Sequence, residues 1–236
     1  MIKRTSQALT AALGFALLLS VQACKKVASD DLKDTVPYHQ QYIVDYNKNT
    51  NKTSASAQFR VRDASGSKVD LNNGAGVTAN SKSPSALQLV PGVYSWTFDG
   101  LVDVNFELTK NSGKKLVNSV AKRDIGEIAF PSSFPTAVSK SSGFTFNWAG
   151  DGLASGETLT VKITGTPSSA SIDPNIEKTV TSGQVTISPS DLEKFAPGTI
   201  TVSMERRKNL VLDVNDDTSN GDIEMTIKTE KETTLN

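Results

Sequence analysis

Short runs of strictly alternating apolar and polar residues recur along the chain. They cover residues 54–61, 144–148 and 159–163, and each has a period of two. One apolar face and one polar face at this period indicate a half-buried antiparallel strand. The predicted inward residues are Ala55, Ala57, Phe59 and Val61; Phe144, Phe146 and Trp148; and Leu159, Val161 and Ile163.

Clusters of Asn, Asp, Ser and Gly separate these runs, at residues 72–76, 111–113 and 149–152. Such clusters mark turns, and short strands between frequent turns are typical of sandwiches. No long amphipathic helical pattern interrupts them. The sequence therefore predicts an all-β fold.

A Pro-Gly turn followed by an alternating strand occurs twice, at residues 90–98 and 196–204. Aligning Gly92 with Gly198 pairs the apolar phases of both segments, and the offset is 106 residues (198 minus 92). One immunoglobulin-like sandwich has ~100 residues. We therefore expect two tandem immunoglobulin-like β-sandwich domains, residues 38–124 and 125–236, each with its own core.

The first copy carries the stretch Leu-Val-Pro-Gly-Val-Tyr at residues 89–94. It resembles the Leu-x-Pro-Gly-x-Tyr approach to a late strand in bacterial immunoglobulin-like domains. That resemblance implies that the hydroxyl of Tyr94 bonds to nearby backbone. Ile200 stands at the equivalent position of the second copy.

Two segments depart from the strand pattern. Residues 188–195 place a Ser or Asp cap ahead of Leu192 and Phe195, which predicts one short helical turn. Residues 130–135 contain two prolines, which favours an edge strand or an irregular first strand over a central strand.

The first residues have the pattern of an export signal. Lys3 and Arg4 precede the almost wholly apolar residues 9–21, thirteen residues in all. A membrane-spanning helix needs about 20 apolar residues, so this run is too short to span. A charged start, a short apolar core and small residues predict a cleaved signal over residues 1–23.

Residues 19–24, Leu-Ser-Val-Gln-Ala-Cys, resemble the lipobox of bacterial lipoproteins. That resemblance implies a diacylglyceryl group on the Cys24 thiol, cleavage before Cys24 and acylation of the new amino terminus. The alternative is an ordinary signal cleaved after Ala23, which leaves a free cysteine. The folded part resembles the immunoglobulin-like lipoproteins of Bacteroidetes in architecture alone.

Cys24 is the single cysteine, so the chain cannot form an internal disulfide. This excludes the disulfide-pinned antibody type of sandwich.

Residues 24–37 are predicted to be the lipidated cysteine and a tether, because they contain few apolar side chains. In Gram-negative lipoproteins an Asp after the cysteine favours the inner membrane. Lys25 and Lys26 stand there, which indicates the outer membrane. Periplasmic or surface orientation stays open. Asp34-Thr35-Val36 is similar to a short O-glycosylation acceptor, and three common residues also match by chance.

The charge balance gives no sign of a nucleic-acid partner. The full chain has 25 basic and 25 acidic residues, and removing residues 1–23 takes away two basic ones, for a net charge of about −2. No basic patch stands out along the sequence.

Catalytic patterns are missing from the sequence. His39 is the sole histidine and follows the predicted tether, so triads and histidine-rich metal sites have no basis. Asp103, Asp151 and Asp173 fall in turn-like sequence, where Asp bonds the local backbone. We predict no catalytic residues, no cofactor and no enzyme activity.

Residues 213–224 allow two interpretations. Asp213, Asn215, Asp217 and Glu224 match the oxygen-ligand spacing of an EF-hand calcium loop. However, Thr218 stands where the loop requires Gly, and both flanks have strand patterns. The preferred interpretation is a hairpin loop at the distal end of the second domain, with no metal ligands.

The function expected is that of a membrane-anchored cell-envelope lipoprotein with a structural, adhesive or protein-interaction role. The alternative is a ligand-binding accessory lipoprotein, for example for glycans, of an outer-membrane uptake system. Glycan sites need exposed aromatic platforms. Trp96 and Trp148 lie in the apolar phase of their strands, which favours core packing and the first function.

Overall fold

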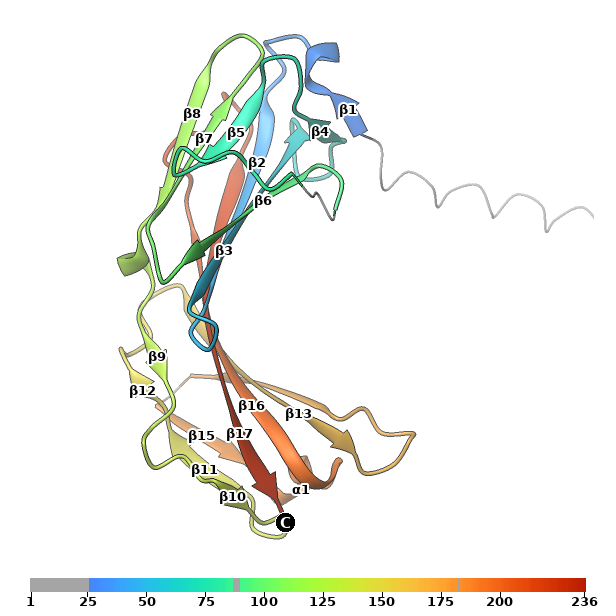
Figure 1. Cartoon of the computed structure of the whole chain (residues 1–236), viewed down its shortest axis with the longest axis vertical. Coiled ribbons are helices and arrows are strands. Elements are labelled where there is room, and N and C mark those ends of the chain that lie inside the picture. The colour runs from blue at the N-terminus through green and yellow to red at the C-terminus, as the bar shows by residue number, and fades with distance from the viewer. Residues whose placement is uncertain (1–25, 87–89, 182) are drawn as a thin grey trace, which may run out of the picture.

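The computed structural model describes residues 26–86, 90–181 and 183–236 (Figure 1). The predicted signal and Cys24 lie outside these residues. Within them the fold is all-β, as the alternation predicts, and the sheets pack as sandwiches. No helix of the described residues is long and apolar enough to cross a membrane.

The two longest strands, β16 and β17, lie near the end of the chain. In chain order they are β1 Lys26–Ala28, β2 Tyr38–Asn47, β3 Lys52–Val61, β4 Lys68–Asp70, β5 Gly76–Ala79, β6 Val93–Asp99, β7 Val104–Thr109, β8 Lys115–Val120, β9 Ile128–Ala129, β10 Ala137–Val138, β11 Phe144–Asn147, β12 Ala149–Gly150, β13 Glu157–Pro167, β14 Asn175–Val180, β15 Gln184–Ile187, β16 Phe195–Leu210 and β17 Gly221–Leu235. Helical turns are η1 Ser29–Asp31, η2 Lys122–Asp124 and α1 Pro189–Leu192.

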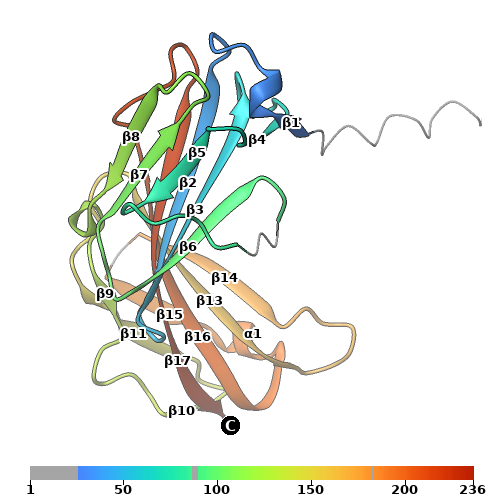
Figure 2. The same ribbon diagram turned by 45° about the horizontal axis from the view of Figure 1, so that its top comes forward.

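One large sheet runs through the whole molecule in the order β1-β4-β3-β2-β17-β16-β13-β14, with β6 also paired to β3 and β10 to β17. Three small sheets pack on it: β5-β7-β8, β11-β15 and β9-β12. Figures 1 and 2 both place β5-β7-β8 over one end of the large sheet and β11-β15 over the other. We call these ends the first and the second lobe.

Strands β16 and β17 join the two lobes. Residues 221–228 of β17 pair in parallel with β2 of the first lobe. Residues 195–208 of β16 pair antiparallel with β13 of the second lobe. Since β16 and β17 pair with each other from Gly198 to Leu210, one hairpin belongs to both sandwiches.

This shared hairpin connects the two lobes across the domain boundary that the sequence predicts at residue 124. Residues 221–228 lie in the predicted second domain, yet they complete the sheet of the first lobe. The buried hydrophobic residues of both lobes also form one connected cluster, where the sequence predicts two separate cores. Alternation identifies a strand and its inward face, and it does not identify the strand's partner.

Aromatic contacts hold the layers together in each lobe. In the first lobe the ring of Tyr42 in β2 stacks on Phe106 in β7, with centroids 4.5 Å apart. In the second lobe Phe134 packs edge-on against Phe146 of β11 at 5.1 Å. Both are the offset or edge geometries that aromatic pairs prefer.

The repeated Pro-Gly segments have the predicted phase. Their inward residues are buried: Tyr94, Trp96, Phe98, Ile200, Val202 and Met204. The Tyr94 hydroxyl accepts a hydrogen bond from the backbone N–H of Leu71 at 2.7 Å, as the resemblance implies. Gly92 precedes β6, whereas Gly198 lies inside the long strand β16. The two segments therefore share a pattern and differ in their pairing.

The described part of the predicted tether is folded. β1 pairs in parallel with β4, from Lys26 opposite Lys68 to Ala28 opposite Asp70. Ser29 is buried, and its hydroxyl donates to the side-chain oxygen of Asn72 at 2.7 Å. Backbone pairing and one buried hydroxyl order this segment despite its low apolar content.

Of the two predicted departures from the strand pattern, the short helical turn is confirmed and the strand at residues 130–135 is wrong. Ser188 caps α1 and accepts a hydrogen bond from the N–H of Asp191 at 3.2 Å. Residues 130–135 form no strand and lie between β9 and β10.

Candidate functional site

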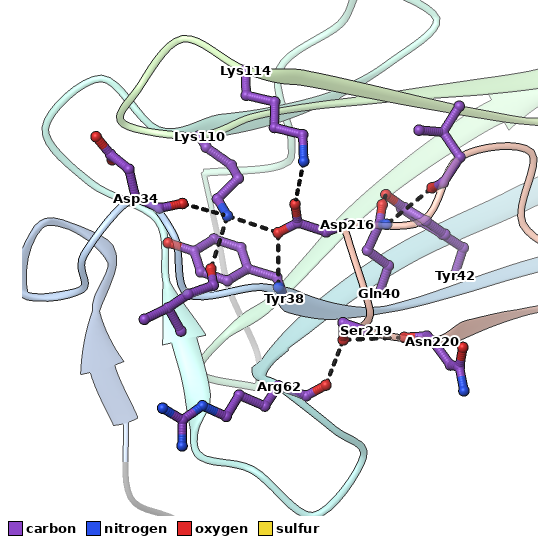
Figure 3. Close-up of polar contacts among 12 residues, drawn as sticks. Asp34, Tyr38, Gln40, Tyr42, Arg62, Lys110, Lys114, Asp216, Ser219 and Asn220 are labelled. Carbon is purple, nitrogen blue, oxygen red and sulfur yellow. Dashed lines mark hydrogen bonds and ion pairs between the residues drawn. The ribbon is translucent and has the colours of Figure 1, made fainter.

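The loop between β16 and β17, residues 211–220, carries the most deeply buried carboxylate of the first lobe. It packs against the end of that lobe that also holds the N-terminal segment (Figure 3). Asp216 is 1% exposed there. Burial of a carboxylate requires compensating partners.

Asp216 is fully compensated. One of its oxygens accepts from Lys110 Nζ at 2.7 Å and from the N–H of Tyr38 at 2.8 Å, and the other accepts from Lys114 Nζ at 2.8 Å. Burial alone would raise the pKa of the Asp216 carboxyl. The hydrogen bonds from Lys110 and Lys114 outweigh burial, and its pKa lies below the ordinary value.

Lys110 is also buried, and its three ammonium donors are occupied. Besides Asp216, Nζ donates to the carbonyl of Val36 at 2.8 Å and to that of Asp34 at 3.3 Å. It also lies 4.4 Å from the ring centroid of Tyr38, a cation–π contact. Lys110 and Asp216 therefore fasten residues 34–38 to the hairpin.

A neutral network extends the same contact. The side chain of Asn118 donates to the carbonyl of Val214 at 3.1 Å and accepts from its N–H at 2.9 Å. Gln40 accepts from the Tyr42 hydroxyl at 2.9 Å. Burial raises the pKa of that phenol. These hydrogen bonds join the hairpin loop to β2 and β8 at the edge of the sandwich, which is a structural role.

The turn between β3 and β4, residues 61–67, is attached to the same hairpin. Arg62 has φ of 67°, in the left-handed region that non-glycine residues rarely occupy. Its N–H donates to the carbonyl of Pro37 at 2.9 Å, and its carbonyl accepts from the Ser219 hydroxyl. The guanidinium points away from the buried cluster in Figure 3 and bonds no other described residue.

A shallow groove of about 420 Å³ lies between this turn and β1. Its lining combines three aliphatic side chains with an arginine, an acid and two hydroxyls: Val27, Leu32, Val61, Arg62, Asp63, Ser65, Gly66 and Ser67. Gly66 is required, because a Cβ there would lie 1.9 Å from the carbonyl oxygen of Val61. We refer to this groove between the turn and β1 as the β1 groove.

The residues considered for catalysis are spread over the molecule. His39 lies on β2 with Nε2 3.7 Å from an oxygen of Asp222. The carboxylate of Asp103 accepts from the N–H of Lys122 at 2.7 Å, and that of Asp151 from Glu127 at 3.0 Å. Asp173 accepts from the N–H of Asn175 at 3.2 Å. Each aspartate thus binds backbone, but only Asp173 binds the local backbone as predicted, because the partners of Asp103 and Asp151 are 19 and 24 residues away.

The residues of the calcium interpretation do not converge. Asp213 accepts from the N–H of Ser119 at 2.9 Å, whereas Glu224 lies on β17 and pairs with Arg207 at 3.3 Å. Among the described residues no group of three acids, histidines or cysteines could hold a metal ion. Residues 213–220 belong to the loop of the β16–β17 hairpin, so the preferred interpretation of this segment as a hairpin loop is confirmed. Its predicted position was wrong: it packs on the first lobe and not at the far end of the second.

Both tryptophans pack into the interior. Trp96 is buried and its Nε1 donates to the carbonyl of Lys82 at 2.9 Å. Trp148 is half-buried, with its ring 5.8 Å from the guanidinium carbon of Arg206. Neither ring is an exposed platform.

Arg206 forms a second buried ion pair, with Glu157, where β13 and β16 meet β9 and β12. It is fully buried and also donates to the carbonyls of Glu127, Asp151 and Gly152. Burial alone would raise the pKa of Glu157. The hydrogen bond from Arg206 is the largest of the opposing effects, and the pKa lies below its ordinary value. A guanidinium with all its donors satisfied fits a structural role.

No pattern in the sequence singles out Lys110, Asp216 or Arg62. Lys110 directly follows β7, and Asp216 stands in an acidic loop that resembled a metal site. No protein-family model matches the chain, and no curated protein is significantly similar to it.

Proposed function

We propose that the chain is a cell-envelope lipoprotein. Cys24 carries the lipid and forms the mature amino terminus, and the two lobes have a structural, adhesive or protein-interaction role. The proposed location is the outer membrane of a Gram-negative bacterium.

The observation that carries this proposal is the position of the lone cysteine. Cys24 ends a lipobox-like stretch and precedes Lys26, the first residue of β1, by two positions. A diacylated and N-acylated cysteine carries more than one chain, and stable anchoring requires at least two such signals.

A binding or structural role is also supported by how the polar groups are used. The buried ions, Lys110 with Asp216 and Arg206 with Glu157, have protein partners for their charges. Among the described residues the exposed large hydrophobic side chains are aliphatic, such as Val211 and Val90. This favours an interaction role over the glycan-binding alternative, which needs exposed aromatic rings.

The test compares the wild-type chain with Cys24→Ser in the bacterial envelope. We expect wild type to partition into detergent and to gain the mass of the acyl groups. Cys24→Ser should partition into the aqueous phase. Ser20→Ala is the matched control, because it changes the same segment and keeps the thiol. Equal membrane partitioning of Cys24→Ser and wild type would contradict the proposal.

A further inference from the structure

We propose that the β1 groove is a membrane-contact surface, in which Arg62 binds the phosphate of lipid headgroups beside the anchor. This inference rests on the proposed lipidation of Cys24. It adds a defined orientation: the first lobe lies against the bilayer through β1 and residues 61–67.

The first argument is covalent reach. Cys24 and Lys26 are two residues apart, and an extended residue spans at most ~3.5 Å, so the first residue of β1 lies within ~7 Å of the cysteine Cα. Val27 of β1 lines the groove. A lipid on Cys24 therefore brings the groove to the headgroup layer.

The second argument is the conformation of Arg62. The left-handed φ of 67° is unfavourable for a long side chain, and unfavourable backbone conformations persist where their surroundings enforce them. Pro37 and Ser219 hold both backbone polar groups of Arg62. The arginine is thus presented from a rigid backbone, with its guanidinium unpaired among the described residues.

The third argument is the chemistry of the lining. A guanidinium binds phosphate oxygens with two parallel hydrogen bonds, and the hydroxyls of Ser65 and Ser67 lie in the same groove. Val27 and Leu32 supply apolar surface of the kind that packs at the boundary between headgroups and acyl chains.

The acid that lines the groove and the acid opposite Lys26 are engaged within the protein. Asp63 accepts hydrogen bonds from the N–H and the hydroxyl of Ser65, and Asp70 pairs with Lys26 at 3.4 Å. The side chain of exposed Lys33, which follows the groove residue Leu32, bonds no other described residue, and the exposed acids Asp31 and Asp34 stand close to it in the sequence. Arg62 is therefore the basic group of the groove that remains available for anionic headgroups.

The experiment places a fluorophore on the turn of the full-length lipoprotein in vesicles of phosphatidylcholine and phosphatidylglycerol. Acylated Cys24 has no free thiol, so Ala64→Cys introduces the one reactive site. Ala64 is an exposed residue of the 61–67 turn, and exposed Ala170 of the second lobe is the matched control position. Quenching by a spin label on lipid headgroups should be several-fold stronger at position 64 than at position 170. Equal quenching at both positions would overturn the proposal.

The role of Arg62 is tested in the Ala64→Cys background. Arg62→Gln should reduce the quenching to near the level at position 170, because the contact with phosphate is lost. Arg123→Gln is the charge-matched control, since Arg123 lies exposed in η2, and it should leave the quenching unchanged. High salt should weaken the wild-type contact, as it screens exposed ion pairs. An Arg62→Gln variant with wild-type quenching would contradict the assignment of Arg62.

The two proposals fail in different ways. If Cys24 is not acylated, the unmodified chain reacts with the thiol reagent and does not remain on vesicles. If Cys24 is acylated and the groove does not contact the membrane, the chain stays on vesicles and position 64 is not quenched. The second result overturns the orientation and leaves the lipoprotein proposal intact.

Discussion

At the scale of single residues, the two buried ion pairs differ from the surface pairs in what they contribute. Removing one partner of a buried pair leaves an uncompensated charge, whereas most exposed pairs contribute little. Lys110 and Asp216 are 3% and 1% exposed, and Lys52 and Asp99 form an exposed pair of the same residue types.

Asp216→Ala should lower the free energy of unfolding by about 3–5 kcal/mol, because Lys110 then stays buried without its anion. Asp99→Ala is the matched control and should cost far less, because this pair is exposed and solvent screens it. Denaturant unfolding of both variants measures this difference. An equal loss of unfolding free energy in the two variants would mean that the buried pair stabilises the fold no more than the exposed pair.

The lowered pKa of Asp216 predicts a dependence of stability on pH. Its folded pKa lies below the ordinary value of 3.8, so its contribution is fully present above that pH. The contribution is lost as the pH falls through the folded pKa. As the pH falls below 3.8 and through the folded pKa, wild type should therefore lose stability more steeply than Asp216→Asn. Parallel pH profiles would contradict this assignment.

At the scale of elements, the pattern of the sequence predicted strands and their inward faces well. Leu159, Val161 and Ile163 of β13 are fully buried, and the cap at Ser188 starts α1 as expected. Both signals are local, because side-chain period and capping depend on neighbouring residues. The folding of residues 26–37 was missed, since β1 is ordered by pairing with β4, about 40 residues away.

The 61–67 turn offers a test at this scale. Gly66→Ala should destabilise the protein by about 1–3 kcal/mol, as overpacked sites do, because its Cβ would overlap the carbonyl of Val61. Gly76→Ala is the control, since no atom lies within 4 Å of its Cβ position. Thermal unfolding of both variants checks the prediction. A Gly66→Ala protein as stable as Gly76→Ala would show that the turn rearranges freely.

At the scale of the whole molecule, the hairpin of β16 and β17 couples the lobes. A chain ending at residue 124 lacks the β17 residues that pair with β2 and the carboxylate that neutralises Lys110. The buried hydrophobic residues of the two lobes also form one connected cluster. Shared pairing of this kind favours cooperative unfolding.

We therefore expect both lobes to unfold together. Trp96 reports on the first lobe and Trp148 on the second, so Trp96→Phe and Trp148→Phe give two proteins with one tryptophan each. Their fluorescence should follow the same denaturant transition as the far-ultraviolet circular dichroism of the same variant. Two separated transitions in either variant would instead support independent domains divided at residue 124.

The sequence by itself determined the class of the fold, the inward faces of its strands and the positions of turns and caps, because these depend on local periodicity and backbone preferences. It also suggested the anchor at Cys24, which remains a proposal. Only the tertiary structure decided that β17 pairs with β2, that Asp216 meets Lys110 across 106 residues, and that Arg62 borders a groove beside β1. Such contacts join distant segments, and their partners are selected by the packing of the whole chain, which no local pattern encodes.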